Sequence, residues 1–190
     1  MSDQEKYWRK YFESRFASAN LNTVRKLDYS NEAVRQQTYA WMLEGCGPVN
    51  EHSVLDVGCG NGEFAVICHC LGASVTGIDI NRVTIGRLKS DHPAIKWGVI
   101  RVGDTEFSQR SLGHFQHVFC AEVLQYVAIR QAVPWLWNLV APGGRLCLVV
   151  PNKNCPIIKK VERRFPGSYL IKWRAATEAL TEKDLASLQE

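Results

Sequence analysis

The sequence lacks the apolar runs that carry proteins into or across membranes. Its longest strongly apolar stretch without acidic or basic side chains, Phe64–Ile78, is shorter than the ~18 to 20 residues that a bilayer span needs. The N-terminus is charged from its third residue, so it offers no apolar core for a secretory signal. We therefore expect a cytoplasmic protein that does not cross a membrane.

The cysteines lack the spacing of a metal or redox site. The chain has seven, and none form a C-x-x-C pair. The closest two, Cys68 and Cys70, would point about 200° apart on a helix, so they cannot converge on one ion. We expect small buried apolar side chains in a reducing compartment, and no bound metal.

Two nucleotide-binding signatures are also absent. Glycines stand at positions 58, 60 and 62, but a dinucleotide turn of the form G-x-G-x-x-G would need another at position 63, which is Glu63. That carboxylate would repel a pyrophosphate docked on the following helix. No Lys-Ser or Lys-Thr pair follows the glycines. These absences argue against NAD, FAD and nucleoside triphosphates as ligands.

What the sequence does contain is a regular alternation of strand and helix patterns. After a helix over 31–44, it predicts strands at 53–57, 74–80, 96–102, 116–121 and 145–151, with helices at 63–71, 83–90 and 129–140. Such an alternation indicates an α/β fold, a Rossmann-like doubly wound and mostly parallel sheet flanked by helices. Ligands of such sheets bind beyond the carboxyl ends of the strands.

We predict one domain made of three regions. Residues 1–50 would form an N-terminal helical lid, because aromatic side chains recur at helical spacing in residues 7–16. Residues 51–152 would form the α/β core that binds the ligand. Residues 153–190 would form a basic segment that contacts substrate, followed by a C-terminal helix; positions 153–174 hold seven Lys or Arg against one Glu.

The polar residues at the strand ends suit a cationic adenosine compound without phosphates. Gly58, Gly60 and Gly62 let the backbone approach a ligand closely. Asp79 ends the second predicted strand and can accept both ribose hydroxyls, while Asp104 follows the third strand and can accept from an adenine amino group. Asp56 can shape the glycine loop or meet an ammonium. S-adenosylmethionine, which carries a sulfonium and an ammonium, fits this set.

The sequence resembles the class I S-adenosylmethionine-dependent methyltransferases, in particular the small-molecule branch that includes the ubiquinone-pathway O-methyltransferases. The similar segments are VLDVGCGNGEFA (54–65), VTGIDIN (75–81), VGDTEF (102–107), HVFCAEVLQYV (117–127) and LVAPGGRLCLVVPN (139–152). By this resemblance, the chain would bind S-adenosylmethionine, release S-adenosylhomocysteine, and lack the last two, antiparallel strands of the family's sheet.

The resemblance also implies a role for each matching residue. The glycines would hold the methionine side of the cofactor, and Ala121 would offer a backbone contact beside the sulfonium. Asp79, with the neighbouring Ile80, would bind the ribose. Asp104 and Thr105 would bind the adenine. Arg35 is similar to the arginine that relatives aim at the cofactor carboxylate.

One departure from the family concerns catalysis. Many relatives have a histidine in a pattern like E-x-L-x-H after the fourth strand, where this chain has Tyr126. An unperturbed tyrosine, with a pKa of about 10, is a poor base at neutral pH. Tyr126 is therefore a candidate for catalysis or for lining the acceptor pocket.

Three functions stay open at this point. We expect methyl transfer to an O, N or C atom of a small molecule, an anionic one if the basic segment binds it. One alternative is nucleic-acid methylation, with residues 153–174 as a strip that binds phosphates; the missing Asn/Asp-Pro-Pro-Tyr signature argues against it. The other is a catalytically silent cofactor-binding subunit. A homodimer would cover the exposed edge of the sheet.

Overall fold

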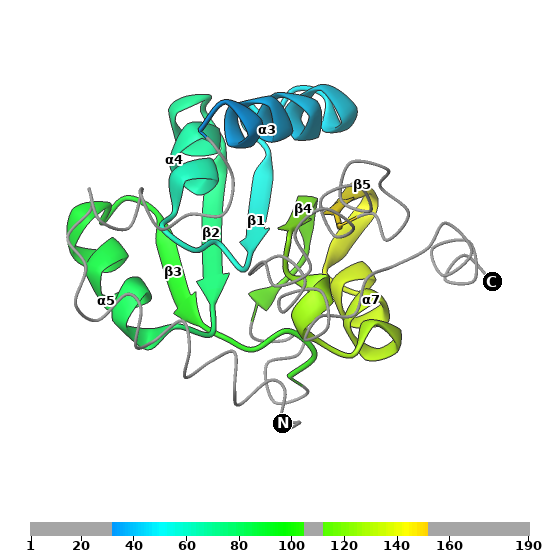
Figure 1. Cartoon of the computed structure of the whole chain (residues 1–190). Helices are drawn as coiled ribbons and strands as arrows, with labels where there is room; N and C mark the ends of the chain where they lie inside the picture. The colour runs from blue at the N-terminus through cyan, green and yellow to red at the C-terminus, as the bar shows by residue number, and fades with distance from the viewer. Residues whose placement is uncertain (1–31, 105–111, 152–190) are drawn as a thin grey trace, which may run out of the picture.

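A computed structural model describes residues 32–104 and 112–151, which form one parallel sheet with helices on both faces (Figure 1). The elements run in this order: α3 (Glu32–Cys46), β1 (Ser53–Val57), α4 (Glu63–Cys70), β2 (Ser74–Asp79), α5 (Arg82–Asp91), β3 (Lys96–Val99), β4 (Phe115–Ala121), η1 (Leu124–Tyr126), α7 (Ile129–Trp137) and β5 (Val140–Val149). The predicted fold class is confirmed.

The order of the strands reverses direction at the centre of the sheet. The strands lie in the order β3-β2-β1-β4-β5, and all four neighbouring pairs are parallel. The chain therefore moves outward from β1 to β3, then crosses back to β4 and moves outward on the other side. In such sheets the ligand crevice lies between the two strands where the direction reverses, here β1 and β4.

Each face of the sheet is buried under a different set of helices. One core cluster joins α3, α4 and α5 to the sheet through side chains such as Met42, Phe64 and Leu88. The other joins α7 to the opposite face through side chains such as Ala132 and Leu136. Because β1 is buried on both sides, its residues after Ser53 are apolar except for Asp56.

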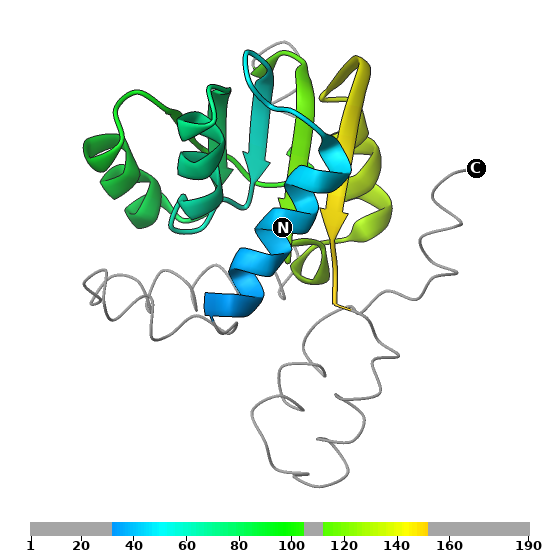
Figure 2. The same cartoon turned by 90° about the horizontal axis from the view of Figure 1, so that it is seen from above.

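Helix α3 crosses the sheet obliquely. Figure 2 shows its first turn near the ends to which the strand arrowheads point. Its last residue, Cys46, is buried at the other end. The start of α3 is therefore on the ligand side of the sheet, which places Arg35 within reach of the crevice.

Several predictions fall outside the described residues. These are the helix over 7–16, the basic segment 153–174, the C-terminal helix, and Thr105. Within 32–104 and 112–151 no antiparallel strand occurs, and no helix in that part is long and apolar enough to span a membrane. The six cysteines there are all free, four of them buried, and no three potential ligands gather for a metal ion.

Candidate functional site

A glycine-rich turn links β1 to α4 at the carboxyl edge of the sheet. Gly58, Gly60 and Gly62 all have positive φ, at 70°, 50° and 78°. A side chain at Gly58 has no room, because a Cβ there would lie 2.2 Å from Cγ2 of Val123. The turn therefore needs glycine both for its backbone angles and for its close packing against the segment after β4.

Asp79 ties this turn to the end of β2. Its Oδ2 accepts from the Gly60 amide at 3.0 Å, and its Oδ1 accepts from the Asn81 amide at 2.8 Å. Burial raises the pKa of this carboxyl, and the backbone donors, Ile80 among them, oppose that rise. Each carboxylate oxygen keeps a second lone pair, so Asp79 can hold the turn and still accept from a ligand's hydroxyls.

Asp56 lies in the middle of the sheet, at the base of the same turn. Its side chain is 5% exposed. Burial, and next the charge of Asp79, raise its pKa to about 7, against one opposing hydrogen bond from the Ala65 amide. Its Oδ2 is buried without a hydrogen-bond partner. A buried acid in this state favours a cation nearby, since a positive charge would stabilise its ionised form.

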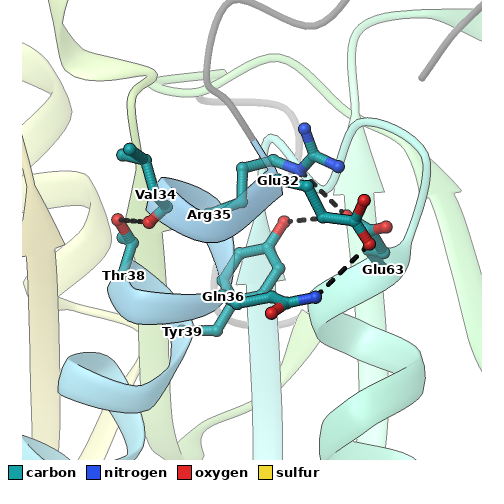
Figure 3. A network of polar contacts seen from close by, with 7 residues as sticks. All are labelled: Glu32, Val34, Arg35, Gln36, Thr38, Tyr39 and Glu63. Atoms are coloured by element: carbon teal, nitrogen blue, oxygen red, sulfur yellow. Dashed lines mark hydrogen bonds and ion pairs between the residues drawn. The ribbon is translucent and has the colours of Figure 1, made fainter. Parts of the chain in front are cut away.

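The first turn of α3 supplies a second polar group to the site. In Figure 3, Arg35 and Tyr39 both point at Glu63, the first residue of α4. Nε of Arg35 donates to Oε2 of Glu63 at 3.2 Å, and the Tyr39 hydroxyl lies 3.4 Å from the same oxygen. The sequence predicted that Arg35 would point toward a ligand carboxylate. The structure places its guanidinium at the glycine turn, against Glu63.

Loss of Arg35 should weaken the binding only of ligands that carry a carboxylate. We expect Arg35→Met to weaken the binding of S-adenosylmethionine about tenfold, because one charge-assisted contact is lost. Decarboxylated S-adenosylmethionine should bind the variant and the wild type equally well. Isothermal titration of both compounds measures this, and equal weakening of both would show that Arg35 supports only the fold of the turn.

The remaining predicted residues are distributed around the crevice. Asp104 lies at the end of the described segment after β3, and its carbonyl accepts from Nε1 of Trp135 at 3.0 Å. Ala121 ends β4 beside β1. Tyr126 belongs to the short helix η1, is half-buried, and its amide donates to the Val123 carbonyl at 2.9 Å. The structure thus brings Asp56, Asp79, Ala121 and the glycines to one edge.

The sequence analysis missed two residues that shape this edge. Asn81 caps α5, because its Oδ1 accepts from the amides of Val83 and Thr84 at 3.0 and 3.1 Å, while its Nδ2 is buried without a partner. An asparagine directly before a helix is the signal that could have revealed it. Trp97 packs beneath the turn, 2.8 Å from where a Cβ at Gly62 would lie. No local sequence pattern marks Trp97 for this role.

Comparison with known proteins agrees with this geometry. A family model described as a methyltransferase domain matches residues 55–148, which include the glycine turn, Asp79 and β4. This chain carries a class I S-adenosylmethionine-dependent methyltransferase domain. It is similar to the ubiquinone biosynthesis O-methyltransferases of Bordetella avium, with 31% identity over 125 residues (64% of this chain, 52% of the relative), and Yersinia pestis, with 31% over 117 residues (60% and 48%). The chain thus spans about half the length of these curated relatives.

Solved structures share the fold of this methyltransferase domain. The N-methyltransferase NodS from Bradyrhizobium japonicum, in complex with S-adenosylhomocysteine, has a TM-score of 0.69 at 22% identity, covering 95% of this chain and 84% of that one. The magnesium protoporphyrin IX methyltransferase from Synechocystis, with bound S-adenosylhomocysteine, has a TM-score of 0.65 at 20% identity, covering 98% and 87%. At these identities the likeness concerns the fold.

Proposed function

We propose that the protein transfers a methyl group from S-adenosylmethionine to an O, N or C atom of a small molecule and releases S-adenosylhomocysteine. The observation that carries this proposal is the glycine turn tied to Asp79, which stands in the crevice between β1 and β4 of a methyltransferase domain. The names of the relatives also point to small-molecule acceptors. No observation favours a nucleic acid or a silent subunit.

The residues present fit the cofactor. Glycine at position 58 lets the backbone of the turn pack closely against the segment after β4. The Oδ2 of Asp56 and the Nδ2 of Asn81 are buried polar atoms without a hydrogen-bond partner, so a bound ligand could supply one. We propose that Asp79 and Ile80 hold the ribose, Asp104 and Thr105 the adenine, and Gly58, Gly60 and Gly62 the methionine end. Ala121 would then border the sulfonium.

The work of the protein in this reaction is to position two reactants and exclude water. When bound, S-adenosylmethionine supplies a methyl group that its sulfonium has already activated for displacement. Arg35 and Asp56 orient the charged end, so the methyl faces the segment after β4. Tyr126, which is half-buried in η1, is proposed to line the acceptor side and direct the nucleophile with its hydroxyl.

We propose an anionic acceptor, because residues 153–174 carry a strong excess of basic side chains. Reversing the charge of four of them, with Lys159, Lys160, Arg163 and Arg164 all changed to Glu, should lower kcat/KM for protocatechuate at least tenfold. Catechol, which lacks the carboxylate, should be methylated at the wild-type rate. Initial rates with both acceptors measure the selectivity.

A second variant controls for charge reversal outside the basic segment. It changes three exposed residues, Lys89, Lys96 and Arg130, to Glu, and so reverses three charges where the test variant reverses four. It should leave the ratio between the two acceptors unchanged. An unchanged ratio in the four-site variant as well would show that the basic segment does not select the acceptor.

Three further expectations remain proposals. The free cysteines among the described residues favour a cytoplasmic location. One edge of β5 lacks a strand partner among the described residues, which favours a homodimer. The division into a lid (1–50), a core (51–152) and a basic C-terminal region (153–190) follows the sequence pattern.

A further inference from the structure

Glu122 has an unusual backbone conformation directly after the carboxyl end of β4. It directly follows β4 and has a φ of 55°, in the left-handed region that side chains larger than hydrogen rarely adopt. Within the described part of the chain, Glu51 is the other residue of this kind that is not glycine. Such conformations cost energy, and they gather at functional sites where the surroundings enforce them.

Two hydrogen bonds hold Glu122 in this conformation. Its amide donates to the Val149 carbonyl at 2.8 Å, and its carbonyl accepts from Nε2 of Gln125 at 2.7 Å. Gln125 is only 2% exposed, and its Oε1 is buried without a partner. A buried amide that satisfies only its donor side is costly, and an apolar side chain would pack there at lower cost. The stability of the fold alone therefore does not explain why a glutamine, and not an apolar residue, occupies position 125.

The position of Glu122 connects this strain to the reaction. Its neighbour Val123 is the residue against which Gly58 packs, so the segment borders the glycine turn. Its other neighbour, Ala121, is at the end of β4 beside β1. Glu122 itself is exposed. Glu122 is thus an exposed acidic residue directly after β4, one position along the chain from Ala121, where we place the sulfonium.

We propose that Glu122 is a catalytic residue that accepts the proton of the acceptor nucleophile, and that Gln125 is a positioning residue that holds Glu122 in place. This deepens the proposed function and rests on it. It also narrows the acceptor to molecules that react through a hydroxyl oxygen.

The proton transfer completes the balance of the reaction. The bond between sulfur and the methyl carbon breaks and its electron pair stays on sulfur, while a lone pair of the acceptor hydroxyl oxygen forms the new bond to carbon. The methylated oxygen still holds its proton and is then strongly acidic. A carboxylate suffices to take that proton.

The strain can be tested without any ligand. Glu122→Gly should raise Tm by about 3 °C, because glycine adopts the left-handed conformation at no steric cost. Glu51→Gly should raise Tm similarly and should leave methyl transfer unchanged, since Glu51 lies in the turn before β1. A lower Tm for Glu122→Gly would overturn the strain argument.

The chemical role is tested by single-turnover methyl transfer to the phenolic hydroxyls of protocatechuate and tyramine. Glu122→Gln and Gln125→Met should each slow transfer, the first about 100-fold, with the Kd for S-adenosylmethionine within twofold of wild type. If Gln125 acts through Glu122, the double variant should be no slower than Glu122→Gln alone.

The outcomes separate this inference from the function on which it rests. Wild-type transfer with full activity of Glu122→Gln would overturn the inference and leave the methyltransferase function intact. Additive losses in the double variant would overturn the role of Gln125. Wild-type protein that binds S-adenosylmethionine but methylates neither acceptor would also overturn the inference. Failure to bind S-adenosylmethionine at all would overturn the proposed function.

Discussion

Asp79→Ala should weaken the binding of S-adenosylmethionine by a factor of ~10² or more. Each hydrogen bond from a ribose hydroxyl to a carboxylate is worth about 1.5 to 3 kcal/mol in a desolvated site, and alanine removes both. The substitution also frees the Gly60 amide, which now donates to Oδ2 at 3.0 Å, so the glycine turn loses its tie to β2. Isothermal titration with S-adenosylmethionine and S-adenosylhomocysteine measures the effect. Both ligands should lose affinity alike, because they share the ribose.

The matched control for this prediction is Asp91→Ala. Asp91, the last residue of α5, is exposed and lies 3.9 Å from Arg87, so it carries the same charge as Asp79 at a different place in the fold. Its loss should leave the affinity for both ligands unchanged. If Asp79→Ala binds them as tightly as this control does, Asp79 does not hold the ribose.

Asp56→Asn should stabilise the ligand-free protein at pH 8 while it weakens cofactor binding. The folded protein holds the Asp56 proton up to a pKa of about 7, whereas an unfolded chain releases it near a pKa of about 3.9. Between these values the unfolded state binds fewer protons, so the free energy of unfolding falls as pH rises, and it levels off above about pH 7. A pKa shift of this size lowers the free energy of unfolding by at most about 4 kcal/mol. Asparagine does not titrate, so Asp56→Asn removes this fall in the free energy of unfolding.

Urea denaturation between pH 4 and pH 8 tests this prediction. The wild-type free energy of unfolding should fall across this range, the Asp56→Asn curve should be flatter, and the two should converge near pH 4. Asp91→Asn should follow the wild type, because its carboxyl is exposed. Parallel curves for wild type and Asp56→Asn would contradict the assignment of the buried charge.

Cofactor binding gives a second measurement for the same substitution. Asp56→Asn should weaken S-adenosylmethionine more than S-adenosylhomocysteine, because the two ligands differ in the positive charge on sulfur and Asp56 is the buried carboxylate at the base of the turn. Equal weakening of the two would assign Asp56 to shaping the glycine loop.

The sequence predicted the strands well where apolar β-branched residues stood between clear breaks. Ser53–Val57 has the predicted bounds. The prediction was wrong between the last helix and the last strand. The helix α7 ends at Trp137 instead of position 140, and β5 begins at Val140 instead of position 145. Pro142 and the two glycines after it were interpreted as a turn. In the structure they belong to an irregular stretch of strand, where the pairing with β4 shifts and Gly143 has a φ of 75°.

The candidate site was predictable to the extent that it depends on position along a strand. Acids at strand ends must reach the same edge of a parallel sheet, so Asp56 and Asp79 could be found from spacing. The pair of Arg35 and Glu63 could not, because it joins two helices 28 residues apart whose packing no local pattern encodes. Nothing in the sequence marks the left-handed backbone of Glu122, since that conformation is imposed by Val149 and Gln125.

The packing of Gly58 against Val123 restricts how relatives of this protein can diverge. A methyl group at position 58 would lie 2.2 Å from a Val123 methyl, so it fits only after position 123 has become smaller. Even then the φ of 70° would disfavour it. The two positions therefore evolve as a pair with a fixed order of events, and lineages that keep valine at 123 are bound to keep glycine at 58.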